Sequence, residues 1–123
     1  MANPEAEDQY YLGIDKFGED KLDEAISHYL KAMELDPSFT DALHGLTRTY
    51  FQKGDLEQAV VYAKKISELD PNDILAHTNL SIYYQEQGKI EEAEKEANKA
   101  RVLGWKQQLK DGKGGTDPLP KSR

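Results

Sequence analysis

The residue types that most often carry chemistry are few in this chain, and they do not fall into catalytic spacings. Cysteine is absent, which excludes a thiolate nucleophile, a disulfide and a thiolate metal site. The three histidines, His28, His44 and His77, do not form a metal-binding spacing such as HExxH. Gly13 and Gly18 have phosphate-loop spacing, but acidic residues follow where lysine and a hydroxyl residue are needed. We therefore expect neither an enzyme nor a metal ion or other cofactor.

The composition indicates one soluble domain. The 123 residues are 32% charged and 37% hydrophobic, and the mean hydropathy is −0.82. No apolar run approaches the ~18 residues needed to span a bilayer, and the first residues do not resemble a signal peptide. Membrane insertion is therefore not expected, and the lack of cysteine favours a cytoplasmic location.

The net charge of −7 is unevenly distributed. Residues 105–123 carry five Lys or Arg and two Asp or Glu, so this segment has a charge of +3 and residues 1–104 have −10. Nucleic-acid binding needs clustered cations, and we do not expect nucleic acid as a partner. Acidic runs such as "EEAEKEA" alternate in sign at helical spacing, which is typical of a solvated, salt-bridged helix face.

The strongest signal in the sequence is an internal repeat of 34 residues. Small, apolar and turn residues all recur at this one interval, which indicates an array of repeated structural units. Gly54 and Gly88 are 34 residues apart, and Asp20 takes their place in the first copy. The other repeated columns are Leu12, Leu46 and Leu80; Leu22, Leu56 and Ile90; Ala25, Ala59 and Ala93; Leu35, Leu69 and Leu103; and Pro37 and Pro71.

Each copy has the spacing of two helices. The segment "LDEAISHYLKAMEL" (22–35) places apolar residues three and four apart, as on one face of an amphipathic helix. Asn3 and Pro4 predict a helix start, and Gly54 and Gly88 predict helix ends. The two Asp-Pro pairs predict the turns between copies. The sequence therefore predicts an all-α fold of six helices, arranged as three helix–turn–helix pairs.

The pattern resembles the tetratricopeptide repeat family, whose motif combines leucine, a small residue, tyrosine, alanine, an aromatic residue and proline. The three copies are residues 6–39, 40–73 and 74–107. The resemblance implies a right-handed α-solenoid of three helix pairs, in which alanine lets the helices approach closely. The matching residues are Leu12, Gly13, Ala25, Tyr29, Ala32 and Pro37; Leu43, Leu46, Tyr50, Ala59 and Pro71; and Leu80, Ser81, Tyr84, Ala93 and Ala100. The departures are Lys16 for tyrosine, Thr47 for a small residue, and Ala63 and Ala97 for the aromatic residue.

The third copy ends differently from the other two. Trp105 stands where the third proline is expected, directly after Gly104. We interpret Gly104 as the end of the last long helix, and residues 105–110 as a minimal cap in which Trp105 and Leu109 fold back onto the third repeat. Two alternatives are a self-association surface centred on Trp105 and a surface tryptophan at the start of a frayed tail. The predicted domain is residues 1–110, and a flexible Gly/Pro/Lys-rich tail follows at 111–123.

The family resemblance also implies a concave groove, lined by the first helix of each pair, that takes a peptide or a partner helix. Its lining here is apolar and aromatic around one cation, Arg48, which is suited to a carboxylate. Side-on packing between neighbouring helices is the alternative role for the aromatic residues. The implied groove residues are Tyr10, Ile14, Phe17, His44, Arg48, Phe51, Leu75, Thr78, Ile82 and Gln85.

Co-chaperone members of this family hold a terminal carboxylate with five Lys, Asn and Arg residues. The corresponding positions in this chain read Tyr10, Ile14, Gly45, Leu75 and Asn79, and only Asn79 agrees. The acidic chaperone tails that those members bind are therefore not expected here. The resemblance implies a non-catalytic adaptor or scaffold for an apolar or aromatic segment of a protein partner. The rival hypothesis is a structural module that forms homo-oligomers through the weakly capped C-terminal repeat.

Overall fold

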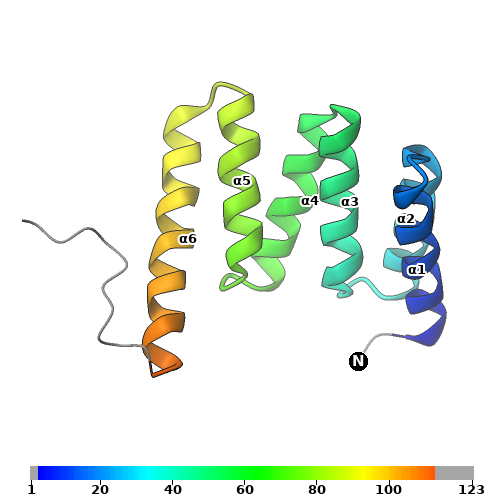
Figure 1. Ribbon diagram of the computed structural model, residues 1–123, viewed down its shortest axis with the longest axis horizontal. Helices are drawn as coiled ribbons and strands as arrows, with labels where there is room; N and C mark the ends of the chain where they lie inside the picture. The colour runs from blue at the N-terminus through cyan, green and yellow to red at the C-terminus, as the bar shows by residue number, and fades with distance from the viewer. Residues whose placement is uncertain (1–2, 113–123) are drawn as a thin grey trace, which may run out of the picture. The chain divides into compact units, whose positions relative to one another are not determined.

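The computed structural model describes residues 3–112, and within this range the chain forms six α-helices and no strand (Figure 1). Consecutive helices pair in the order α1–α2, α3–α4 and α5–α6, which confirms the predicted all-α fold of helix pairs. The predicted flexible tail lies outside the described residues, except for a turn at Asp111 and Gly112. The helices are α1 (Pro4–Gly18), α2 (Leu22–Leu35), α3 (Thr40–Lys53), α4 (Leu56–Leu69), α5 (Ile74–Glu86) and α6 (Ile90–Lys110).

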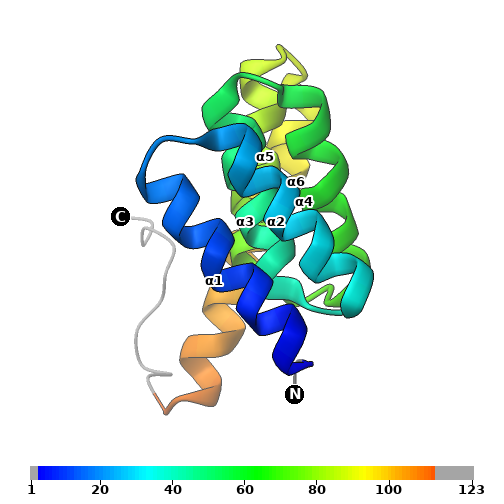
Figure 2. The ribbon, with the colours of Figure 1, turned by 90° about the vertical axis from the view of Figure 1, so that its right-hand side faces the viewer.

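The helices belong to two compact units. Unit 1, Met1–Pro71, contains α1 to α4. Unit 2, Asn72–Arg123, contains α5 and α6. Figure 2 shows α1 and α2 of unit 1 nearest the viewer, packed side by side and joined by a short turn.

The starts of three helices follow the capping signals in the sequence. The Asn3 side chain accepts hydrogen bonds from two backbone N–H groups in the first turn of α1, at 2.8 and 3.3 Å, and Pro4 follows directly. Asp55 caps α4 and Asp73 caps α5 in the same manner, at 3.1 and 3.0 Å. These side chains satisfy backbone donors that a helix start leaves unpaired.

The turn inside each helix pair uses the same backbone conformation at the same repeat position. Asp20, Gly54 and Gly88 have φ angles of 63°, 91° and 79°. Glycine adopts positive φ without a steric penalty, and Asp is one of the few other residues that tolerate it. The substitution of Asp20 for glycine in the first copy therefore leaves the turn geometry unchanged.

The end of α6 differs from the prediction. Gly104 does not end the helix, because α6 continues for 21 residues to Lys110. The segment 105–110 is therefore the last part of α6 and not a separate cap folded back onto the repeat. Lys, Gln and Leu after Gly104 favour helix, and the left-handed residue that follows the helix end is Gly112, with φ 77°.

Fully buried alanines lie where the helices of unit 1 pack against one another, as the repeat pattern predicts. Alanine at these positions lets neighbouring helix backbones approach closely. The Thr47 hydroxyl, at a position where the family has a small residue, donates to the Ala59 carbonyl at 2.7 Å and ties α3 to α4. The alanines without exposed surface are Ala6, Ala25, Ala32, Ala42, Ala59 and Ala63.

The tightest packing in unit 1 is around Tyr29 of α2, which is only 1% exposed. Its ring lies against the backbones of α1 at Gly13 and of α3 at Gly45. A Cβ atom at Gly13 would come within 2.5 Å of the ring, and one at Gly45 within 2.7 Å. Real Cβ atoms do not approach other atoms this closely, so both positions require glycine because of the ring.

The substitution Gly45→Ala should destabilise unit 1, because the added methyl group overpacks the site next to Tyr29. We expect the free energy of unfolding to fall by about 1–3 kcal/mol, measured by denaturant titration followed by circular dichroism. Gly18→Ala in the same unit is the matched control, since a Cβ there has no neighbour within 4 Å. Equal stabilities of the two variants would contradict this account of the site.

The substitution Gly104→Ala should have the opposite effect. A Cβ at Gly104 meets no atom within 4 Å, and the residue lies inside α6. Alanine in a helix interior is favoured over glycine by about 0.5–1 kcal/mol, so the variant should be more stable by a similar amount. A loss of helical signal and stability would instead indicate that Gly104 ends the helix.

Candidate functional site

The structure brings two of the predicted groove residues of unit 1 together. The guanidinium carbon of Arg48 on α3 lies 5.0 Å from the centroid of the Phe17 ring on α1. This distance is typical of a cation–π contact. Arg48 is exposed and Phe17 is half-buried, so the pair forms a boundary between the core and the surface.

Tyr10 is a packing residue as well as a predicted groove residue. Its ring centroid lies 6.1 Å from that of Tyr29 and 5.2 Å from that of Phe39, and it borders the buried cluster that includes Phe39. Burial raises the pKa of the Tyr10 hydroxyl, the charge of Asp41 adds to this, and Arg48 opposes it. Tyr10 therefore contributes to a ligand surface only with the part of its side chain that stays exposed.

The remaining predicted residues of unit 1 extend the surface along both helices. Ile14 is exposed on α1, while His44 and Phe51 are half-buried on α3. Residues 10, 14 and 17, and likewise 44, 48 and 51, are spaced so that each set lies along one face of its helix. Unit 1 thus carries two adjacent stripes, apolar apart from His44 and Arg48.

The predicted residues of unit 2 form one exposed stripe on α5. Leu75, Thr78, Ile82 and Gln85 are all exposed, and their spacing of three and four places them on a single helix face. The Thr78 hydroxyl donates to a backbone carbonyl one turn earlier, at 3.0 Å, and not to another helix. Two large apolar side chains on this stripe are therefore open to a ligand.

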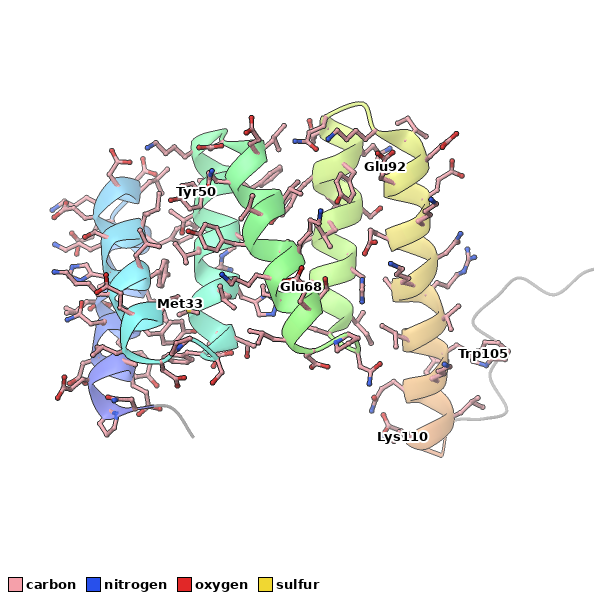
Figure 3. The ribbon with its side chains drawn as sticks, turned by 180° about the vertical axis from the view of Figure 1, so that it is seen from behind. Met33, Tyr50, Glu68, Glu92, Trp105 and Lys110 are labelled. Carbon is pink, nitrogen blue, oxygen red and sulfur yellow. The ribbon has the colours of Figure 1, made fainter. Side chains whose placement is uncertain are left out.

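Trp105 and Leu109 were predicted to cap the third repeat, but both are exposed on α6. Figure 3 shows the Trp105 side chain projecting from α6 on the side away from α5. Val102 is also exposed and lies one turn before Trp105. Self-association through this surface, one of the two alternatives to a cap, stays a prediction.

His77 and Glu96 form a polar pair inside unit 2, and the sequence predicted the burial of His77 but not that of Glu96. His77 is buried, as expected for a packed histidine, and its Nδ1 donates to the Glu96 carboxylate at 2.7 Å. Lys99 donates to the other carboxylate oxygen at 3.0 Å. Glu96 belongs to the "EEAEKEA" run that was expected to be solvated, and for this residue the expectation was wrong. Its side chain is mostly covered, because it faces α5.

The pKa of Glu96 reflects two opposing influences. Burial alone would raise it, but the hydrogen bonds from His77 and Lys99 together outweigh burial and hold the pKa below its usual value. The ionised carboxylate is thus the stable form in the folded protein, and the pair acts as a structural element of unit 2.

The sequence did not reveal a pocket of about 350 Å³ in unit 1. It involves the second helices of the two repeats, which the family resemblance does not assign to the groove. Met33, which borders it, is labelled in Figure 3. The lining residues are Leu30, Met33, Glu34, Pro37, Leu43, Tyr62 and Lys65.

Two features are absent from residues 3–112. No group of three or more His, Asp or Glu side chains in this range is arranged to hold a metal ion. In the same range, no helix combines the length and the apolar character needed to cross a bilayer.

Comparison with known proteins identifies the repeat. Residues 16–80, more than half of the chain, match the family described as "Tetratricopeptide repeat". This chain belongs to the tetratricopeptide repeat family. Members of the family are non-enzymatic protein-interaction modules, which agrees with the prediction that the chain is not an enzyme. None of the curated proteins compared with the chain matches it.

Solved structures of other tetratricopeptide repeat proteins are similar to this one. A crystal structure of MamA has a TM-score of 0.83 and 28% identity, over 85% of this chain and 61% of the MamA chain. The chain thus spans about three fifths of MamA. The first such domain of Spaghetti (RPAP3), bound to the HSP90 peptide SRMEEVD, has a TM-score of 0.78 and 23% identity, over 83% and 82% of the two chains. PcrH, in complex with the chaperone binding region of PopB, has a TM-score of 0.78 and 22% identity, over 84% and 83%.

The substitution Glu96→Gln should destabilise the protein in a pH-dependent manner. A carboxylate with a lowered folded-state pKa contributes stability above its unfolded pKa of about 4.3, and this contribution is lost as the pH falls through the folded value. We expect a loss of about 1–2 kcal/mol near neutral pH, and a smaller difference from wild type below about pH 4. Urea titrations across this pH range measure the effect. The exposed Glu94→Gln is the control, and an equal, pH-independent loss in both variants would argue against the pair.

Proposed function

We propose that this tetratricopeptide repeat chain is an adaptor or scaffold that binds a segment of a partner protein at the predicted groove residues. The ligand is a peptide or helix with apolar or aromatic side chains and at least one carboxylate. The observation that carries the proposal is the Arg48 guanidinium over the Phe17 ring.

Arg48 is suited to a carboxylate because of how it is held. The Phe17 ring lies on one face of the guanidinium group, which leaves its N–H edges for a planar acceptor. Arg48 is exposed and forms no ion pair with any residue in the described range 3–112, although the chain has a net charge of −7. A carboxylate on a partner would supply the missing anion.

Apolar contacts accompany this cation. Ile14 and Phe51 lie on the same faces of α1 and α3 as Phe17 and Arg48. Large apolar side chains around a charged anchor are typical of the centre of a recognition surface. This combination favours a ligand in which an acidic residue has aromatic or aliphatic neighbours.

The relatives support a peptide or protein ligand but not the same motif. RPAP3 and PcrH, which share the fold, are seen with an HSP90 peptide and with a region of PopB. The positions of the co-chaperone carboxylate clamp are mostly apolar in this chain, with Ile14 and Leu75 among them. The ligand should therefore depend less on charge than an acidic chaperone tail does.

The test is selection of binding peptides from a random display library against the full chain. Selected peptides should combine aromatic or aliphatic residues with Asp or Glu. Arg48→Glu should weaken their binding about 10–100-fold in fluorescence anisotropy, because a charge-assisted bidentate contact contributes about 1.5–3 kcal/mol. Replacement of the peptide carboxylate by its amide should cause a similar loss in wild type and little further loss in the variant.

The control is Lys64→Glu on α4, an exposed charge reversal outside the predicted groove. It should change affinity less than about twofold, since it alters net charge without touching the ligand. Both variants must keep the helical circular dichroism of wild type. Peptides that lose equal affinity with both variants, or with neither, would contradict recognition at Arg48.

A further inference from the structure

The C-terminal part of α6 presents an apolar face without a partner among the described residues. Val102, Trp105 and Leu109 are each at least 40% exposed, and their spacing of three and four places them on one side of the helix. The 21 residues of α6 exceed the 13 of α5, so its last turns extend past the start of α5 (Figure 1). Three large side chains therefore face solvent on a rigid helix.

This face is bordered by cations. Arg101 and Lys106 are both exposed and stand on either side of the apolar stripe. Between Lys99 and Lys110 the sequence contains no Asp or Glu. Arg101 bonds to the neutral Asn98 side chain at 2.7 Å, and Lys106 forms no ion pair within residues 3–112. The surface is thus apolar at its centre and positive at its edges.

The outer face of α1 has the opposite character. Tyr11 is 58% exposed and Leu12 is 41% exposed. Three carboxylates, Glu5, Asp8 and Asp15, are exposed around them, and none forms an ion pair with a residue in the described range. Asp8 is three residues before Tyr11, and Asp15 is three residues after Leu12, so carboxylates and apolar side chains share this face.

The single lysine of α1 does not neutralise this negative charge. Lys16 is half-buried, and its amino group lies 4.0 Å from the Glu19 carboxylate and 3.9 Å from that of Glu24. It is therefore already shared between two other acidic residues, and the charge of the α1 outer face stays uncompensated within the chain.

We propose that the outer face of α6 in one copy of this chain binds the outer face of α1 in a second copy. Both faces carry exposed apolar side chains, and their charges are opposite in sign, which is the arrangement that fixes partner and orientation at interfaces. Because different faces of the two copies meet, the contact is heterologous and each copy keeps one free α1 face or α6 face for a further copy.

The contact is weak and salt-dependent. A single helix-on-helix contact buries less than the ~1,200 Å² of stable interfaces, so association requires high local concentration. Charged edges that are exposed lose attraction as salt rises, because the screening length falls to about 3 Å at 1 M. The α1 outer face adjoins the proposed peptide surface, because Tyr11 and Ile14 are three residues apart on α1.

The experiment is sedimentation velocity of the full chain from ~10 μM to ~1 mM in low salt. The weight-average mass should rise above the 13.9 kDa of one chain and fall back towards it in 1 M salt. Trp105 is the only tryptophan in the sequence, so its fluorescence should shift to the blue over the same concentration range.

A charge exchange identifies the two faces. Arg101→Glu/Lys106→Glu makes the α6 face negative, and Asp8→Lys/Asp15→Lys makes the α1 face positive. Each variant alone should stay monomeric, with at least a tenfold weaker self-association, because like charges meet. An equimolar mixture of the two should associate again, since each α6 face then finds an α1 face of opposite charge.

The control for net charge is Lys64→Glu/Lys65→Glu on α4, which changes the charge by the same amount as the α6 variant and should associate as wild type does. A wild-type chain that stays monomeric at the highest concentration would overturn the proposal. This holds even if the positive α6 face then binds anionic phosphatidylserine vesicles in a sedimentation assay, because its partner would be a membrane surface and not a second copy. Association that survives the α1 variant would also overturn it, because the α6 face would then pair with something other than α1.

Discussion

The packing of one aromatic ring against two glycines is the constraint on which unit 1 depends. Tyr29 fills the space between α1 and α3, and it does so in direct contact with backbone at Gly13 and Gly45. Because neither helix can move closer to or further from the ring without a clash or a void, their separation is set. That separation is also what places Phe17 of α1 under Arg48 of α3. The candidate ligand surface is thus a consequence of core packing.

Features that depend on local sequence or on the repeat period could be predicted, and features that depend on side-chain fit could not. The period located the six helices and their turns, and alanine marked the close crossings. Gly104 misled because a glycine ends a helix only when its backbone turns left-handed, and here that conformation occurs at Gly112. Glu96 misled because its run of charges looked uniform, although this one carboxylate faces His77. One error concerns the backbone conformation of a residue and the other the direction of a side chain, and the residue type alone determines neither.

Helix α1 contributes residues to the core, to the candidate ligand surface and to the solvent-exposed outer face. Ala6 and Gly13 are buried in the core, Phe17 lies beneath Arg48 of α3, and Tyr11 and Leu12 are exposed to solvent. Because Tyr11 is only three residues from Ile14, the proposed ligand surface and the proposed self-association surface are neighbours on this helix.

Two part-buried polar pairs have a consequence for how the repeats of such a chain can be recombined. In the first repeat Gln9 on the first helix bonds to His28 on the second, at 2.8 Å, and in the third repeat His77 on the first helix bonds to Glu96 on the second. Both pairs are separated by 19 residues, so they occupy equivalent places with the histidine on opposite helices. A crossover between these repeats would set histidine against histidine, or glutamine against glutamate. Exchange of whole helix pairs therefore keeps both hydrogen-bonded pairs, whereas exchange of single helices replaces them with different ones.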